Sequence, residues 1–160
     1  MLARRCAATL ALALGAATAA SAQTATQTVT FQVNAINVVG FAGAPTLTIT
    51  TAAAGSAPTS VTDATSTWAV TTNQTGAKIT AALSSNMPAG LTLSVDLGAP
   101  AGATSNGYQA LSTTSADLVD AVTKLAQGSL GVTYKLDATA TAGVVASSTR
   151  VVTYTISGGV

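Results

Sequence analysis

The chain has 160 residues, of which 48% are hydrophobic and only 7% are charged. It contains six Lys or Arg, five Asp, no Glu and no His. The missing histidine excludes His-based general bases, Ser–His–Asp or Cys–His nucleophiles and imidazole metal ligands. A net charge of +1 is too small to neutralise the roughly six to ten phosphates of a typical nucleic-acid site. We therefore expect no enzyme activity, no cofactor or metal site and no nucleic-acid partner.

Residues 1–22 have the pattern of a Sec-type signal peptide. Arg4-Arg5 forms its positive start, residues 6–14 its apolar core, and Ala20-Ser21-Ala22 a small-residue cleavage site. The apolar core is too short to supply the ~20 residues that a membrane-spanning helix needs. We therefore expect cleavage after Ala22 and a secreted mature chain without a membrane span, located in the periplasm or at the cell surface.

The mature chain would contain no cysteine, because Cys6 is the only one in the sequence and leaves with the signal peptide. Disulfides are permitted outside the cytoplasm, but none could form here. Packing and strand pairing must then supply the stability. The length of residues 23–160 suits one domain, and we expect residues 23–27 to be a flexible N-terminal lead.

Alternation of apolar and polar residues dominates the mature chain and predicts strands with one buried face. The alternating runs lie at 28–33, 46–50, 68–70, 79–83, 91–97, 130–136 and 150–157. Breaker residues predict loops between them, at 40–45, 52–63, 73–76, 86–90 and 98–107. This spacing predicts an all-β protein, a single immunoglobulin-like antiparallel sandwich of about seven to nine strands.

The segment 115–127 is compatible with two structures. Its apolar residues have helix-like spacing: Leu118, Val119, Val122 and Leu125. Ser115 could cap such a helix, but the same segment could also be an irregular strand that turns at Gly128. We expect a short helical turn near 116–120, followed by strand.

Few side chains are candidates for a binding site. Asp117 and Asp120 are the only carboxylates close in sequence. A calcium ion needs about six to eight oxygen ligands, so we interpret this pair as a solvated surface feature. Tyr108, beside Asn106-Gly107 in a predicted loop, is the best candidate for a platform on which a sugar could stack.

The low charge also affects the predicted sheet edges. Soluble monomers carry about 25% charged residues and protect edge strands with Lys, Pro or inward-pointing charges. The first and last predicted strands, 28–33 and 150–157, contain one charge between them, Arg150. Edges of this kind permit strand addition, in which backbone hydrogen bonds give affinity and alternate side chains give specificity.

The first of these strands could be donated to a neighbouring molecule. Val29, Phe31 and Val33 alternate with polar residues, and the short lead before them could reach another subunit. We hypothesise that residues 25–33 are a donor strand in an assembly. The alternative is that they pair within their own domain.

Two Thr-rich runs lie near the ends of the mature chain: TQTVTFQV at 26–33 and SSTRVVTYTI at 147–156. Both runs resemble secreted pilin-type β-sandwich proteins, of the spore coat U and chaperone–usher fimbrial types. The resemblance implies a complementable immunoglobulin-like sandwich that builds surface fibres. It also implies further copies of the chain, another surface subunit or a chaperone as partners. Many fimbrial subunits carry an early cysteine, which this mature chain lacks.

Together, these features predict an exported structural protein of the bacterial cell surface, such as a pilus or filament subunit. The alternative is a secreted carbohydrate- or surface-binding module with a role in adhesion. That module would use the loops at 52–63 or 98–108.

Overall fold

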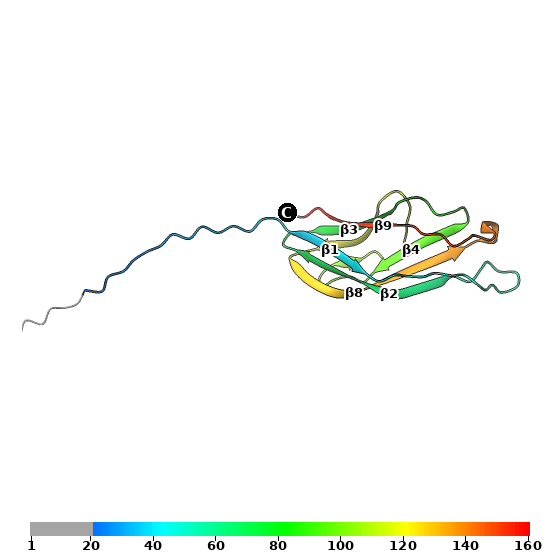
Figure 1. The fold of residues 1–160 in the computed structure, drawn as a ribbon, viewed down its shortest axis with the longest axis horizontal. Coiled ribbons are helices and arrows are strands. Elements are labelled where there is room, and N and C mark those ends of the chain that lie inside the picture. The colour runs from blue at the N-terminus through cyan, green and yellow to red at the C-terminus, as the bar shows by residue number, and fades with distance from the viewer. Residues whose placement is uncertain (1–20) are drawn as a thin grey trace, which may run out of the picture. The chain divides into compact units, whose positions relative to one another are not determined.

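The computed structural model describes residues 21–160, which contain two antiparallel sheets and one 3-10 turn (Figure 1). The predicted signal peptide lies outside the described residues, apart from Ser21 and Ala22. Residues from Val33 to Val160 form one compact unit, and residues 21–32 belong to a separate unit. In the part of the chain that is described, no helix is long and apolar enough to cross a membrane.

The first sheet has five strands in the order β1-β2-β8-β4-β6, and the second has four in the order β5-β7-β3-β9. The first comprises β1 (Asn37–Ala42), β2 (Val61–Thr72), β8 (Leu125–Ala138), β4 (Leu91–Leu97) and β6 (Gln109–Ala110). The second comprises β5 (Thr104–Ser105), β7 (Ala116–Val122), β3 (Ala77–Leu83) and β9 (Val152–Ser157). The 3-10 turn is Ala140–Ala142. The prediction of an all-β antiparallel sandwich is confirmed.

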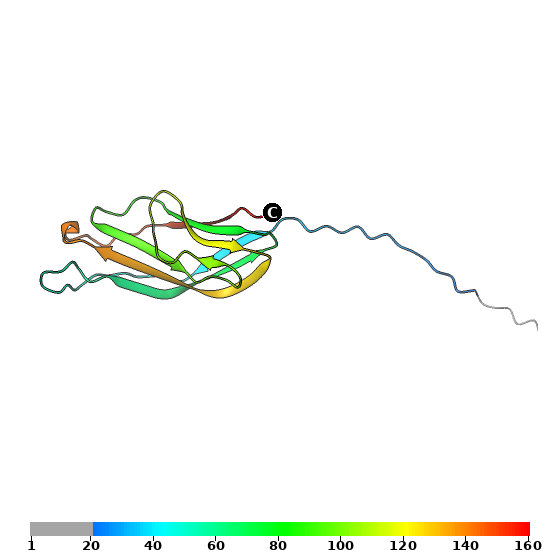
Figure 2. The ribbon, with the colours of Figure 1, turned by 180° about the vertical axis from the view of Figure 1, so that it is seen from behind.

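One hydrophobic core lies between the two sheets, which Figures 1 and 2 show from opposite sides. Alternate residues of the long strands enter this core, as the period-two pattern predicts. Trp68 of β2 is only 1% exposed, and its indole Nε1 donates a hydrogen bond to Gly98 O at 3.2 Å. The one polar atom of the largest core side chain therefore has a hydrogen-bond partner.

The predicted helical turn at 116–120 is wrong, because these residues belong to strand β7. Register shifts interrupt the pairing of β7 with β3, and Ala121 has a positive φ of 62°. Such irregularities re-aim side chains along a strand, and Leu118 and Val119 are both buried although they are neighbours. The helix-like spacing therefore comes from bulges in a strand.

The first strand of the fold lies later in the chain than predicted. Among the described residues no strand includes any of 28–33, and β1 instead uses residues of the predicted loop 40–45. The pairing places Phe41 opposite Trp68 and Asn37 opposite Thr72. Strand β2 ends at Thr72, so no residue of β2 remains to pair with the chain before β1.

The predicted strand at 46–50 keeps its alternation but not its pairing. Leu47 and Ile49 are half-buried between exposed threonines, yet no strand is formed there. Gly43 directs the chain away from β2: its φ is +120°, and a Cβ at this position would lie 2.5 Å from Ser66 Oγ. The chain therefore leaves the β2 edge at Gly43, and Leu47 still packs against the core.

Candidate assembly surface

The segment that precedes β1 exposes a regular row of large apolar side chains. Val29 is 71% exposed, Phe31 is 89% exposed and Val33 is 77% exposed. Alternate residues of an extended chain lie on one face, and residues 23–33 carry no charge. The described residues before Asn37 form no strand, so the structure does not show the pairing within its own domain that was the alternative to a donor strand.

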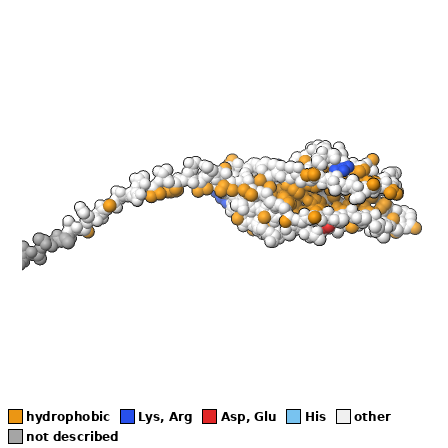
Figure 3. All heavy atoms as spheres, in the orientation of Figure 1, with side chains coloured by type: hydrophobic (Ala, Val, Ile, Leu, Met, Phe, Trp, Pro, Cys, Tyr) orange, Lys and Arg blue, Asp and Glu red, His pale blue; other side chains and the backbone are white. Residues whose placement is uncertain are grey.

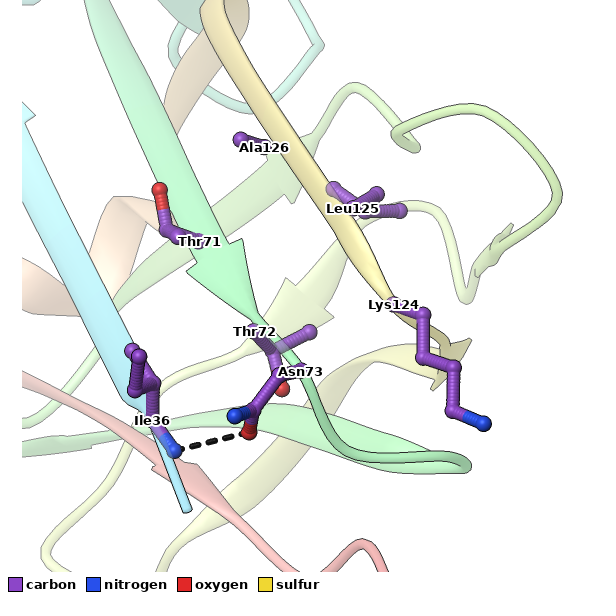
Figure 4. A pocket seen from close by; sticks show the side chains of 7 residues that line it. All are labelled: Ile36, Thr71, Thr72, Asn73, Lys124, Leu125 and Ala126. Carbon is purple, nitrogen blue, oxygen red and sulfur yellow. Dashed lines mark hydrogen bonds between the residues drawn. The ribbon is translucent and has the colours of Figure 1, made fainter. Parts of the chain in front are cut away.

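The chain is held firmly where it enters β1. Ile36 N–H donates to Asn73 Oδ1 at 2.8 Å (Figure 4). Asn73 Nδ2 also donates to Asn34 O at 2.7 Å. In addition, Asn37 Nδ2 donates to Gly158 O at 3.4 Å. The sequence pattern predicts that Asn73 lies in a turn and gives no sign of its hydrogen bonds to the chain before β1, because these partners lie more than thirty residues away.

A shallow hollow lies beside this clamp (Figure 4). It is lined by Ile36, Thr71, Thr72, Asn73, Lys124, Leu125 and Ala126. Lys124 is the only charged residue of this lining, and no carboxylate or histidine accompanies it. The hollow therefore lacks the convergent polar groups that fix a small ligand.

Strands β1 and β9 are edge strands of different sheets and run beside each other (Figure 1). Between them, the Phe41 ring stacks on the Tyr154 ring at a centroid distance of 3.7 Å and on the Trp68 ring at 5.9 Å. The hydroxyls of Tyr134 and Tyr154 are 2.7 Å apart. We call Phe41, Trp68, Tyr134 and Tyr154 the aromatic seam; it joins the two sheets along this side.

The two hydroxyls of the aromatic seam stay uncharged at neutral pH. Burial raises the pKa of Tyr134 above its ordinary value of 10.0. Burial also raises the pKa of Tyr154, and the hydrogen bond with Tyr134 raises it further. The contact between Tyr134 of β8 and Tyr154 of β9 therefore does not titrate in the physiological range.

Only two residues of the seam lie at the surface of the domain, on the edge strands themselves. Phe41 and Tyr154 are half-buried, and so are their neighbours Val39, Val152 and Ile156. Hydrophobic side chains gather on this face of the domain in Figure 3. Phe41 and Val39 were missed from the sequence, because Val38 and Gly40 obscure their alternation.

Tyr108 lies between β5 and β6 and is 47% exposed. The polar groups beside it have partners within the fold. Asn106 Nδ2 donates to Asp120 Oδ2 at 2.8 Å, and Gln109 Nε2 donates to Asn106 O at 2.7 Å. The ring is available for stacking, whereas these amides already make internal hydrogen bonds.

The structure does not bring Asp117 and Asp120 together as one ligand set. Asp117 forms an exposed ion pair with Lys78 at 2.8 Å, and Asp120 accepts from Asn106. The hydrogen bond that Lys78 Nζ donates to Asp117, followed by the charge of Asp117, raises the pKa of Lys78. Within residues 21–160, no cluster of three or more His, Cys, Asp or Glu could hold a metal ion.

No protein-family model matches the chain, and neither the curated proteins nor the solved structures contain a significant match.

Proposed function

We propose that the protein is an exported structural subunit of a bacterial surface filament, assembled by β-strand complementation with residues 25–33 as the donor strand. One observation carries this proposal: Val29, Phe31 and Val33 form an exposed alternating row outside any strand. Monomeric proteins seldom leave large apolar patches uncovered without an interaction to explain them. A β-strand added to another subunit would bury this row and pair its backbone.

The energy available from such burial is large enough for assembly. Burying one Val or Phe side chain contributes about 1.5–3 kcal/mol. Three such side chains would therefore contribute ~5–9 kcal/mol before the costs of association are subtracted. The absence of charge from residues 23–33 means that no ion has to be desolvated when the segment is buried.

The sequence also supports export. Residues 1–22 carry the charge, apolar core and small-residue site of a signal peptide. A mature chain without cysteine can assemble outside the cytoplasm without forming unwanted disulfides.

Deletion of residues 23–33 tests the proposal directly. We expect mature protein 23–160 to form fibres visible by negative-stain electron microscopy, and the deletion variant to be a folded monomer by circular dichroism and gel filtration. The variant should fold because β1 begins only at Asn37. Unfolding of the deletion variant would contradict the proposal, as would a mature protein that stays monomeric at high concentration.

Tyr108 supports a second candidate function, the binding of carbohydrate. Its ring is 47% exposed in the loop between β5 and β6, and aromatic faces are available to the apolar face of a sugar. A glycan array with the wild type and a Tyr108→Ala variant tests this role. Binding that persists in the variant would rule out Tyr108 as the platform.

A further inference from the structure

The sandwich has four edge strands, and only two of them are long. Strands β5 and β6 have two residues each, whereas β1 and β9 have six each. Very short edge strands are one way in which proteins prevent unwanted strand addition. The two long edges contain no Lys, Asp or Pro, so they have none of the usual protection.

Strand β9 pairs with β3 on one side, and no strand in the described part of the chain pairs with its other side. Next to this pairing, Ser84 N–H donates to Val151 O at 2.9 Å. In an antiparallel pair, successive residues turn their backbone groups alternately toward the partner and away from it. The N–H and C=O groups of Val152, Tyr154 and Ile156 therefore point toward the free edge of β9.

The same three residues supply the apolar half of a strand-binding site. Their side chains face the core but remain half-buried. They occupy three alternate positions of β9, and Val29, Phe31 and Val33 occupy three alternate positions of the exposed segment. Strand β9 has free backbone groups along one edge, and the exposed segment has apolar side chains that nothing covers. Pairing of the two would therefore satisfy the backbone groups and bury the side chains.

The clamp at the start of β1 favours donation to a second molecule. The residues that connect the segment 29–33 to β1 are hydrogen-bonded to the domain. Asn73 holds both Ile36 N–H and Asn34 O in place there. Asn37 is also tied to Gly158, just beyond the end of β9. A second copy of the chain could reach β9 without breaking any of these bonds.

We propose that the free edge of β9 accepts residues 29–33 of a second copy, which add as the next strand of the β5-β7-β3-β9 sheet. This inference rests on the proposed function. The added strand runs antiparallel to β9, the more stable arrangement per residue. Phe31 lies opposite Tyr154 and covers the exposed end of the aromatic seam. Neither strand carries a charge, so the interface desolvates no ion.

This arrangement makes a specific prediction for cysteine cross-linking. With Phe31 opposite Tyr154, Thr30 lies opposite Thr155, and both side chains face away from the core. Thr155 directs its backbone groups to β3, so it forms a non-hydrogen-bonded pair with Thr30. The Cα atoms of such a pair are ~4.5 Å apart, within the range that a disulfide accepts.

The experiment uses the absence of cysteine from the mature chain. Mature Thr30→Cys and Thr155→Cys proteins, carrying different tags, are mixed, assembled and oxidised, and the products are identified on non-reducing gels and by mass spectrometry. We expect a disulfide between the two variants. Thr30→Cys mixed with Thr104→Cys is the matched control, because Thr104 is an exposed threonine on β5, the opposite edge of the same sheet. The control pair should give no cross-link above background.

The possible failures are distinguishable. If fibres form but Thr30→Cys reacts with position 104, or with neither position, the acceptor assigned here is wrong and the proposed function stands. A cross-link to Thr153→Cys in place of Thr155→Cys would overturn the antiparallel register. If no variant and no wild-type protein assembles, the proposed function itself fails. Circular dichroism of each variant before mixing shows that it is folded.

Discussion

Replacement of Phe31 by Thr should weaken assembly strongly and leave the folded domain unchanged. Phe31 is 89% exposed in the single chain, so its removal costs the monomer almost nothing; surface changes usually stay within about 0.5 kcal/mol. In the assembly, the ring contributes about 1.5–3 kcal/mol from burial and about 0.5–1.5 kcal/mol from its aromatic neighbours. The expected loss is therefore ~2–4.5 kcal/mol at each subunit contact.

This loss can be measured as a critical concentration. Since 1.4 kcal/mol is a tenfold change in an equilibrium constant, Phe31→Thr should raise the critical concentration by about 30- to 1,600-fold. Sedimentation of assembled protein at a series of concentrations gives this value. The matched control is Thr30→Ser, which changes the opposite face of the same segment and should leave the critical concentration nearly unchanged.

One pattern of results would refute the reasoning. If Phe31→Thr lowers the thermal midpoint of the monomer by several degrees and leaves the critical concentration unchanged, Phe31 packs within its own domain. The monomer must be measured below the critical concentration, because binding to another copy itself raises the apparent stability.

Two further substitutions test the fold. Gly43→Ala should destabilise the domain by about 1–3 kcal/mol in denaturant unfolding, because a φ of +120° and a Cβ 2.5 Å from Ser66 Oγ both oppose a side chain. Gly40→Ala, with nothing within 4 Å, is its control, and equal effects would contradict the steric argument. Hydrogen bonds from Thr65 lower the pKa of Asp63 below its ordinary value of 3.8. The carboxylate therefore stabilises the fold above that pH and loses its effect as the pH falls through the lowered pKa. Asp63→Asn should unfold more easily than wild type at pH 7, and the two proteins should converge as the pH falls from 7 through the lowered pKa. A constant difference between the two proteins across that range would show that the carboxylate charge is not responsible.

Strands with a regular register were predictable from the sequence. Strands β3, β4 and β9 each alternate without a break, and β9 pairs with β3 residue by residue from Val152 to Ser157. In β3 and β9 the side chains alternate between more and less buried positions, so the period-two pattern reports burial. In β4 the sequence alternates in the same way, although Ser94 is buried together with Leu93 and Val95. Their bounds agree closely with the predicted runs at 79–83, 91–97 and 150–157.

The predictions were wrong for β7 and for the first strand, where contacts between distant residues, and not the local pattern, decide the structure. In β7 the bulges change which side chains face inward, so a strand acquired helical spacing. At the N-terminus the run 28–33 alternates regularly, yet residues 37–42 are the ones that pair with the edge of β2. Phe41 can stack on Trp68 and Tyr154 at the same time, and this long-range contact selects residues 37–42 over 28–33.

The candidate surface was only half predictable for the same reason. The row Val29, Phe31 and Val33 is local, and alternation together with the lack of charge was enough to suggest a donor strand. The position of β9 at a sheet edge depends on strand order, which follows from contacts between distant segments. The Asn73 clamp and the stacking of Phe41 on Tyr154 likewise join residues far apart in sequence.

The few charged residues lie outside the two long edge strands and the exposed N-terminal segment. Ion pairs join Lys78 with Asp117 and Lys135 with Asp137, on strands β3, β7 and β8. Exposed pairs of this kind contribute only about 0–1 kcal/mol to stability, so their main effect is to keep these parts of the surface hydrated. None of the charged residues lies in β1, in β9 or in residues 23–33. Charges on edge strands are one of the features that prevent chains from adding to one another. This chain lacks them in β9 and in residues 29–33, which we propose to meet in the assembly, and also in β1.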